Sequence, residues 1–309
     1  MKRTIFISLT MLMFGICNIG ANTIIKIEKE LTYDQYTLDD IYPYRQGTRE
    51  FQWGKIKDNL LRVDALRAQN DSSWAILQNK SNANGKPANA RDAGTDAYHA
   101  VTDRYGVQAN QAIPLFLADD LKTPDRYALD GSLVNIIAQQ DDFVLAKTTT
   151  FEGEFLIPAK YVHRISGVPA FAKVIVVDRT NQNIATFEKV DDVWKVRSMN
   201  PATTGVHRPP YQKETPLGLF VLQTKVAKMQ FYADGTTRIA GFAPWASRFS
   251  AGGYIHGIPV NLPATEIVEF SGTLGTTPRS HMCVRNASSH AKFIYDNFAV
   301  DDTIVFVIE

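Results

Sequence analysis

The chain has 309 residues, with 33 Lys and Arg against 32 Asp and Glu and a formal net charge of +1. This near-neutral balance, without a basic block or stripe, argues against nucleic acid as a partner. The length leaves room for two or three domains and at least one sizeable core. There are only two cysteines, Cys17 and Cys283, which excludes a scaffold held together by disulfides.

Residues 1–21 have the layout of a secretory signal peptide. A charged start precedes an apolar run of about 15 residues, short for a membrane-spanning helix, and Ala21 offers a cleavage point. An uncleaved anchor is one alternative. Lipid attachment at Cys17 is another, against which the bulky Ile16 argues. We therefore predict an exported protein, periplasmic or facing the cell wall, either released or anchored through its N-terminus.

Residues 22–110 are predicted to form an N-terminal region with a helix and a polar linker. Apolar residues recur at three- and four-residue steps over residues 49–69, which is typical of an amphipathic helix that packs on a core. Residues 79–96 are rich in Asn, Ala, Gly and Lys and are predicted to form the linker.

Residues 111–165 change to short apolar runs separated by Gly and Asp turns, which is typical of a small β-barrel. The predicted strands cover residues 113–117, 131–137, 143–147 and 154–158. This order, with its closing IPAKYV segment at residues 157–162, resembles a bacterial SH3-like domain. The resemblance implies either a module that binds a cell-wall polymer or peptide, or a spacer that only packs.

Residues 168–309 are predicted to form a second, β-rich domain. Residues 174–178 and 184–188 flank an Asn-Gln-Asn turn and indicate a hairpin. Further strands are predicted at residues 193–196, 217–222 and 303–308, with a helix at residues 287–298. The fold class is therefore mainly β, with a helix-containing N-terminal region, a small barrel and a larger β domain.

Cys283 is the only thiol left if the signal is removed. Its reactive form is the thiolate, and an imidazole can take its proton during attack. His281 lies two residues before Cys283 and shares its face if the segment is extended, whereas His256 could approach across a sheet. One cysteine without C-x-x-C or H-x-x-x-H spacing argues against zinc, and we predict no metal and no cofactor.

The SHMCVRN segment at residues 280–286 resembles the S/T-H-G-C signature of the YkuD-type L,D-transpeptidases. Three further stretches resemble the same family in the same order: residues 174–182, the TPLG turn at residues 215–218, and residues 242–257. Four ordered matches are more specific than one short motif. The resemblance implies a YkuD-type β-sandwich with a short helix.

The resemblance also implies a reaction on peptidoglycan stem peptides. Cys283 would attack the carbonyl between the third and fourth residues, release D-Ala and form a thioester, which an amine of a second stem would resolve into a 3→3 cross-link. His256 would be the base, oriented by the Gly257 carbonyl, and His281 would help to hold the oxyanion with the amides around Met282 and Cys283. The residues implied to bind substrate are Arg285, Ser280, Gly257, Met282, Trp245 and Tyr254.

Alternatives to this reaction remain open in the sequence. Water as the acceptor would make the protein an L,D-carboxypeptidase, and a degenerate site would leave a non-catalytic wall-binding protein. A structural ion pair is the alternative role for Arg285. A cysteine peptidase of another type is disfavoured because the local signature of papain-like nucleophiles is missing.

Two features depart from the family pattern. Met282 replaces the usual glycine, which costs strain if the backbone needs a positive φ there and is tolerated if the backbone is extended. The spacing between His256 and Cys283 is long, and the extra residues 258–275 are predicted to cover the cleft as a lid.

Overall fold

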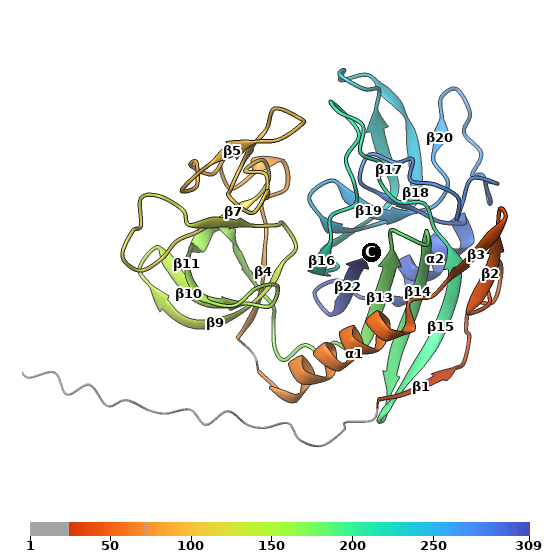
Figure 1. Cartoon of the computed structure of the whole chain (residues 1–309), viewed down its shortest axis with the longest axis horizontal. Coiled ribbons are helices and arrows are strands. Elements are labelled where there is room, and N and C mark those ends of the chain that lie inside the picture. Colours follow the sequence, from red (N-terminus) through yellow and green to blue (C-terminus); the bar gives the residue numbers. More distant parts are fainter. Residues whose placement is uncertain (1–24, 72) are drawn as a thin grey trace, which may run out of the picture.

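The computed structural model describes residues 25–71 and 73–309. Figure 1 shows two β-rich parts side by side, a smaller one at the left and a larger one at the right, with helix α1 below. The expected export signal, including Cys17, lies outside the described residues. Within these ranges, no helix is both long enough and apolar enough to cross a membrane.

A six-stranded sheet forms the centre of the larger part, in the order β1-β15-β14-β13-β22-β16. The β1–β15 and β13–β22 pairs are parallel, and the other neighbours are antiparallel. The strands are β1 (Lys26–Lys29), β13 (Lys173–Asp178), β14 (Asn183–Val190), β15 (Val193–Pro201), β16 (Gly218–Val221) and β22 (Thr303–Ile308).

Both faces of this sheet are buried, as alternation along β13 illustrates. Val174 and Val176 belong to a core shared with helix α1 (Trp53–Ala68), whereas Ile175 and Val177 belong to a core on the opposite face. The helix contributes a stripe of apolar residues at helical spacing to the first core: Ile56, Leu60 and Val63. A strand that is covered on both sides is accordingly a continuous apolar run.

A second sheet, in the order β17-β18-β19-β21 with β20 beside β18, closes the other core. Ile294 of helix α2 (Ser288–Asn297) packs there with Ile255 and Val284 of this sheet. The strands are β17 (Thr224–Tyr232), β18 (Ile239–Ser250), β19 (Gly253–His256), β20 (Val260–Asn261) and β21 (Val284–Arg285). The larger part is thus a two-sheet sandwich, flanked by α1.

A five-stranded antiparallel sheet, β11-β10-β9-β4-β12, forms the smaller part. Its own core includes Val134, Val144 and Ile157. The strands are β4 (Trp74–Leu77), β9 (Leu133–Gln140), β10 (Phe143–Thr148), β11 (Glu154–Pro158) and β12 (Val162–Arg164). We call residues 74–164 the small domain; its likeness to an SH3 domain stays a prediction.

Short elements complete the chain. The small domain also carries 3-10 helices η1 (Lys80–Asn82) and η2 (Ala159–Tyr161), with hairpins β5 (Gly94–Thr95)–β6 (Val101–Thr102) and β7 (Ile113–Leu115)–β8 (Arg126–Ala128). The hairpin of β2 (Ile41–Tyr44) and β3 (Gly47–Glu50) precedes α1.

The mainly β class is confirmed, and each predicted strand and helix has a counterpart in the structure. The organisation predicted for residues 22–110 differs. Strand β1 and helix α1 join the larger part, whereas β4 and the supposed linker at residues 79–96 belong to the small domain. Burial explains this, because all four residues of β4 are buried.

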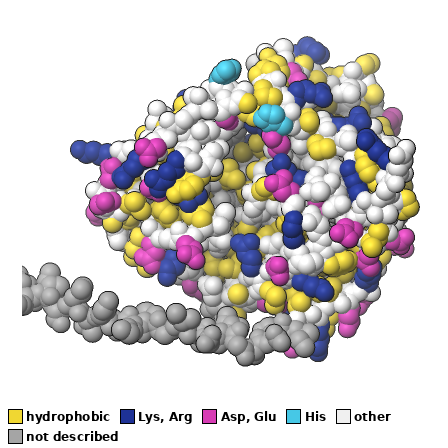
Figure 2. Space-filling view, viewed as in Figure 1, with side chains coloured by type: hydrophobic (Ala, Val, Ile, Leu, Met, Phe, Trp, Pro, Cys, Tyr) yellow, Lys and Arg dark blue, Asp and Glu magenta, His cyan; other side chains and the backbone are white. Residues whose placement is uncertain are grey.

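The predicted lid at residues 258–275 packs elsewhere. Phe270 stacks on Tyr36, and the carbonyl of Val268 accepts a hydrogen bond from Ser288 at the start of α2. These contacts hold the segment against α2 and the N-terminal region. Figure 2 shows basic and acidic side chains interspersed over the face in view, without a stripe of one sign.

Candidate active site

The sheet of β18, β19 and β21 has one face in the core and one face with polar chemistry. β19 and β21 are parallel neighbours, with Ile255 opposite Val284 and His256 opposite Arg285. Ile255 and Val284 point into the core. Because side chains alternate along a strand, His256 and Arg285 project from the other face, toward which Cys283, one residue before β21, also projects. We call this the cleft face.

His256 is buried on the cleft face, and its ring is oriented by the backbone. Its Nδ1 lies 2.6 Å from the carbonyl oxygen of Gly257, the contact that the family resemblance implies. A proton on Nδ1 leaves Nε2 as the free basic atom. Burial lowers the pKa of His256 to about 4, with Arg285 adding to the shift and the Gly257 hydrogen bond opposing it. The imidazole is therefore neutral at physiological pH.

Cys283 is also neutral in the resting state. Its Sγ donates a hydrogen bond to the carbonyl of Gly252 at 3.3 Å. Burial raises the pKa of the thiol to about 11, although a backbone hydrogen bond with Tyr254 and the charge of Arg285 oppose the rise. A neutral thiol and a neutral imidazole on the same face of the sheet would favour proton transfer during attack over a preformed thiolate–imidazolium pair.

Met282 adopts the backbone conformation that glycine favours. Its φ is +118°, so the strained alternative raised by the sequence is the one observed. The Met282 carbonyl accepts a hydrogen bond from Thr215 Oγ1 at 2.8 Å, and the same hydroxyl accepts one from the Gly205 amide at 2.8 Å. In a trans peptide the N–H points away from the C=O, so this hold on Met282 also sets the direction of the Cys283 amide.

Arg285 places a cation beside the thiol without a counter-charge. Its Nε is buried and has no hydrogen-bond partner, and no ion pair of Arg285 occurs among the described residues. Burial lowers its pKa, with the neighbouring charge of Arg279 adding to the effect. The alternative role of a structural ion pair is thus not observed within the described chain.

Two residues of the signature segment lie differently from expectation. Ser280 is buried and donates its hydroxyl hydrogen bond to the Cys283 carbonyl, so it holds the shape of this loop. His281 Nε2 lies 2.7 Å from Asp234 Oδ1, on the turn between β17 and β18. The extended segment assumed for His281 and Cys283 is interrupted by the positive φ of Met282. The imidazole of His281 is therefore engaged by Asp234.

Trp245, predicted to contact substrate, lies beside helix α2. Its ring lies 5.6 Å from that of Tyr295, and the Lys292 ammonium lies 5.0 Å from the Trp245 ring. Its φ is +55°, and the β17–β18 pairing omits Trp245 between Pro244 and Ala246 without a shift of register. Tyr254, by contrast, lies on the cleft face beside Cys283.

The comparisons with known proteins concern this same region. Residues 172–307 match the family model of the L,D-transpeptidase catalytic domain, YkuD. The C-terminal part of this chain is a YkuD domain. Cys283, His256 and Arg285 all lie within the matched residues. A comparison with curated proteins gave no match.

Several solved structures are similar to the chain at low identity. An L,D-transpeptidase from Mycobacterium tuberculosis is 21% identical, with 60% of this chain and 70% of that chain covered and a TM-score of 0.34. An L,D-transpeptidase from Mycobacterium smegmatis is 18% identical, with 57% and 82% covered and a TM-score of 0.36. A fused Zn-dependent amidase/peptidase/peptidoglycan-binding protein from Clostridium acetobutylicum is 23% identical, with a TM-score of 0.33; 45% of this chain matches, over about half (52%) of that chain's length.

The cleft face of the YkuD domain uses two residues to which the sequence assigned no role. Thr215 was noticed only as part of a turn motif, and Gly252 contributes a backbone carbonyl that no side-chain pattern reveals. Gly205 could have indicated that its segment approaches the loop of Met282 and Cys283 closely. A Cβ on Gly205 would lie 2.8 Å from the Met282 Cα, so the two backbones approach as only glycine allows.

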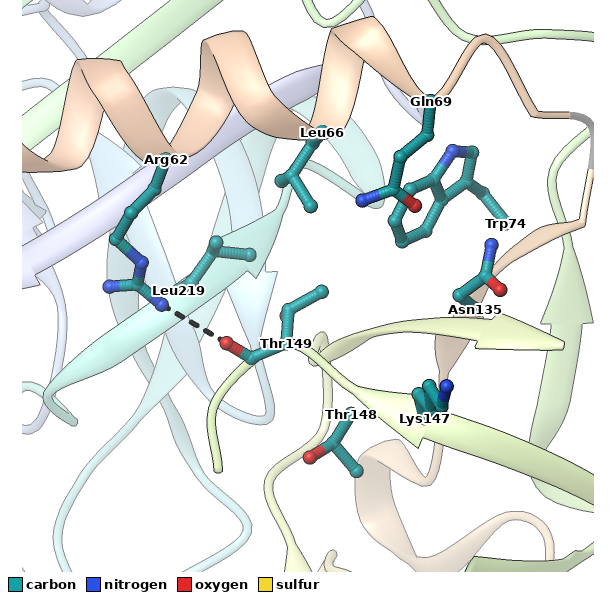
Figure 3. Close-up of a pocket in the computed structure, with 9 residues that line it drawn as sticks. All are labelled: Arg62, Leu66, Gln69, Trp74, Asn135, Lys147, Thr148, Thr149 and Leu219. Carbon is teal, nitrogen blue, oxygen red and sulfur yellow. Dashed lines mark hydrogen bonds between the residues drawn. The ribbon is translucent and has the colours of Figure 1, made fainter. Parts of the chain in front are cut away.

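A cavity of about 310 Å³ lies away from this chemistry, between α1, the small domain and β16 (Figure 3). Of its nine lining residues, only Leu219 belongs to the YkuD domain. It contains neither a cysteine nor a histidine. No group of three or more His, Cys, Asp or Glu side chains able to hold a metal occurs among the described residues.

Proposed function

We propose that the protein is a cysteine-dependent L,D-transpeptidase that forms 3→3 cross-links between peptidoglycan stem peptides. The observation that carries this proposal is the arrangement of Cys283, His256 and Arg285 on one face of the β19–β21 pair, within residues that match the YkuD family. An exported location, expected from residues 1–21, would bring the protein to this substrate.

The first step is acylation of the thiol. The Cys283 Sγ leaves its hydrogen bond to the Gly252 carbonyl, gives its proton to His256 Nε2 and attacks the carbonyl carbon between the third and fourth stem residues. The tetrahedral intermediate carries a negative oxygen, which the Cys283 amide would meet; the Thr215–Met282 hydrogen bond fixes the direction of that amide. Collapse breaks the C–N bond, the imidazolium returns its proton to the leaving amine, and D-Ala departs from a thioester.

The second step transfers the acyl group. An amine on the third residue of another stem loses a proton to His256 as its nitrogen attacks the thioester, and the Cys283 thiol leaves with that proton. Arg285, which lacks an anionic partner among the described residues, would pair with a stem carboxylate and position the donor. Water in place of the amine would give L,D-carboxypeptidase activity.

The experiment that tests this proposal incubates the protein with disaccharide tetrapeptides and follows the products by mass. Loss of D-Ala with appearance of cross-linked dimer is the expected outcome. Loss of D-Ala without dimer would assign the carboxypeptidase reaction instead. No conversion by the folded protein, together with measurable binding of the tetrapeptide, would favour a wall-binding protein.

A further inference from the structure

The small domain is anchored to the strand row that carries the nucleophile. Arg248 of β18 lies opposite Tyr254 of β19, and Tyr254 in turn neighbours Cys283, so the three side chains lie in a row on the cleft face. Two members of this row bind the small domain. Arg248 Nη1 pairs with Asp130 at 2.6 Å, and the hydroxyl of Tyr254 accepts a hydrogen bond from Lys80 Nζ at 2.7 Å.

The Asp130 contact is buried and fixes the geometry of this junction. The Asp130 side chain is completely buried and also accepts hydrogen bonds from the amides of Asn79 and Ala251, both at 2.7 Å. Ala251 precedes Gly252, the residue whose carbonyl binds the Cys283 thiol. One carboxylate of the small domain therefore ties together the small domain and the turn beside the nucleophile.

Lys80 is the residue after Asn79, whose amide bonds to Asp130. The Asn79 side chain donates hydrogen bonds to the carbonyls of Gly85 and Ala112, which holds the start of η1 in place. Lys80 itself is exposed, its ammonium lies 5.4 Å from the Tyr254 ring, and no carboxylate pairs with it among the described residues. The small domain thus presents, beside Tyr254, a cation without a carboxylate partner among the described residues.

The cleft face consequently has an excess of positive charge. Neither Arg279 nor Arg285 has an ion pair among the described residues, and Lys80 adds a third cation from the other side of Tyr254. Asp234, an acid in contact with the signature segment, is engaged by His281. Such a face suits a substrate that carries carboxylates at more than one position.

We infer that the small domain forms one wall of the catalytic cleft and that Lys80 is a specificity residue that binds a carboxylate of the donor stem peptide. This inference rests on the proposed function. The carboxylate could come from the side chain of the third residue or from the C-terminus of the fourth. Both sources present the same group, and amidated donors distinguish them.

The test compares three donors: the free acid, a stem amidated on the third residue and a stem amidated at the C-terminus. The acylation kcat/KM is measured for the native protein and for Lys80→Met. For the native protein, amidation of the recognised carboxylate is expected to lower kcat/KM about 10-fold, the contribution of one charge-assisted hydrogen bond. Lys80→Met should lower the kcat/KM for the free-acid donor by the same factor. It should leave unchanged the kcat/KM for the donor that is amidated at the recognised carboxylate, and this identifies which carboxylate Lys80 binds.

Two matched variants separate recognition from scaffolding. Lys160→Met removes another lysine of the small domain, whose ammonium lies 5.2 Å from the Tyr161 ring, and should leave the acid-to-amide ratio intact. Tyr254→Phe removes the hydroxyl that holds Lys80 but keeps the cation, so that ratio should persist. Equal loss on all donors in Lys80→Met and Tyr254→Phe would overturn the inference. If no donor is turned over, the proposed function fails, and donor affinities of Cys283→Ala with and without Lys80→Met still test Lys80.

Discussion

The two faces of the β19–β21 pair differ in chemistry and in their effect on stability. One face carries Ile255 and Val284, which are fully buried in an apolar core and contribute to stability. The other carries His256, Cys283 and Arg285, whose burial disfavours the charged state of each group. Side chains one residue apart on the same strands therefore have opposite effects on folding, and chemistry is concentrated where burial is unfavourable.

The largest expected effect is on activity and comes from the cleft face. His256→Ala should lower the acylation rate by about 10² to 10⁴-fold, because it removes the proposed base that takes the Cys283 proton. Rapid-mixing mass spectrometry of the thioester measures this rate. An unchanged rate in the variant would assign the base elsewhere, with His281 as the next candidate.

The matched change on the core side should affect stability instead. Ile294→Ala on α2 removes a fully buried side chain that packs with Ile255 and Val284, and should cost about 2 to 5 kcal/mol of unfolding free energy. Acylation by the folded variant at 25 °C should stay within about twofold of the native rate. Urea unfolding measures the loss, and a large change in acylation would show that the two faces are not independent.

Acid should destabilise the protein through its buried histidines. Burial lowers the pKa of His256 to about 4 and that of His290 to about 3, so the unfolded chain binds more protons than the folded one. The contribution of the two neutral histidines to the unfolding free energy is fully present above about pH 6.5. It should fall as the pH drops toward 4, by on the order of 3 kcal/mol or more for each histidine at the acid limit. The measurement is unfolding free energy against pH.

The control for the acid prediction is His290→Asn. This variant loses one titrating group while His256 remains, so its stability should fall less steeply between pH 6.5 and 4. An identical slope would mean that His290 is not the source of proton uptake. In the native protein, His256 should stay neutral down to about pH 4. Wherever the fold persists, kcat/KM should therefore not fall through protonation of this base above that pH.

Loss of the Thr215 hydroxyl should lower both stability and the acylation rate moderately. Thr215→Val removes the hydroxyl that bonds to Met282 and Gly205, leaving buried groups unsatisfied at a cost of about 1 to 3 kcal/mol. Acylation should slow because the Cys283 amide loses its fixed direction, with kcat reduced more than KM is raised. Thr215→Ser should restore both quantities, and failure of that rescue would exclude the hydrogen bond as the cause.

Met282→Gly should produce the smallest effect and the opposite sign. Glycine relieves the positive φ of +118°, worth about 1 to 3 kcal/mol, and loses part of that gain to chain entropy. A net stabilisation of about 1 kcal/mol is expected, read as a rise in Tm. Met282→Ala keeps the Cβ and should gain nothing; an equal rise in both variants would locate the strain in the side chain.

The sequence predicted the elements whose patterns are local. The hairpin of β13 and β14 and the helices α1 and α2 follow from apolar periodicity and turn residues close together in the chain. The WAIL run of β4 could not be assigned to the small domain because its partners β9 and β12 lie far along the chain. Strand β1 reads KIEK, and its single apolar residue, Ile27, is too weak a pattern to predict pairing with β15.

The site was predictable where a motif names a side chain. His256 and Cys283 were found in this way, and so was the Gly257 carbonyl. The long-range contacts were not: Asp234 engages His281 across 47 positions, and Lys80 reaches Tyr254 across 174. The first contact depends on how loops pack within the YkuD domain and the second on how the two domains pack, and no local pattern encodes either. The position of Trp245 was missed for a similar reason, because its partners Tyr295 and Lys292 lie on helix α2.

The central claim is that Cys283 becomes acylated by the donor stem. The most direct test is intact-protein mass spectrometry during turnover of disaccharide tetrapeptide, followed by peptide mapping of the adduct. The account predicts one thioester per chain, mapped to Cys283, equal to the donor minus D-Ala and absent from folded Cys283→Ala. An adduct that persists in Cys283→Ala, or turnover by that variant, would contradict it.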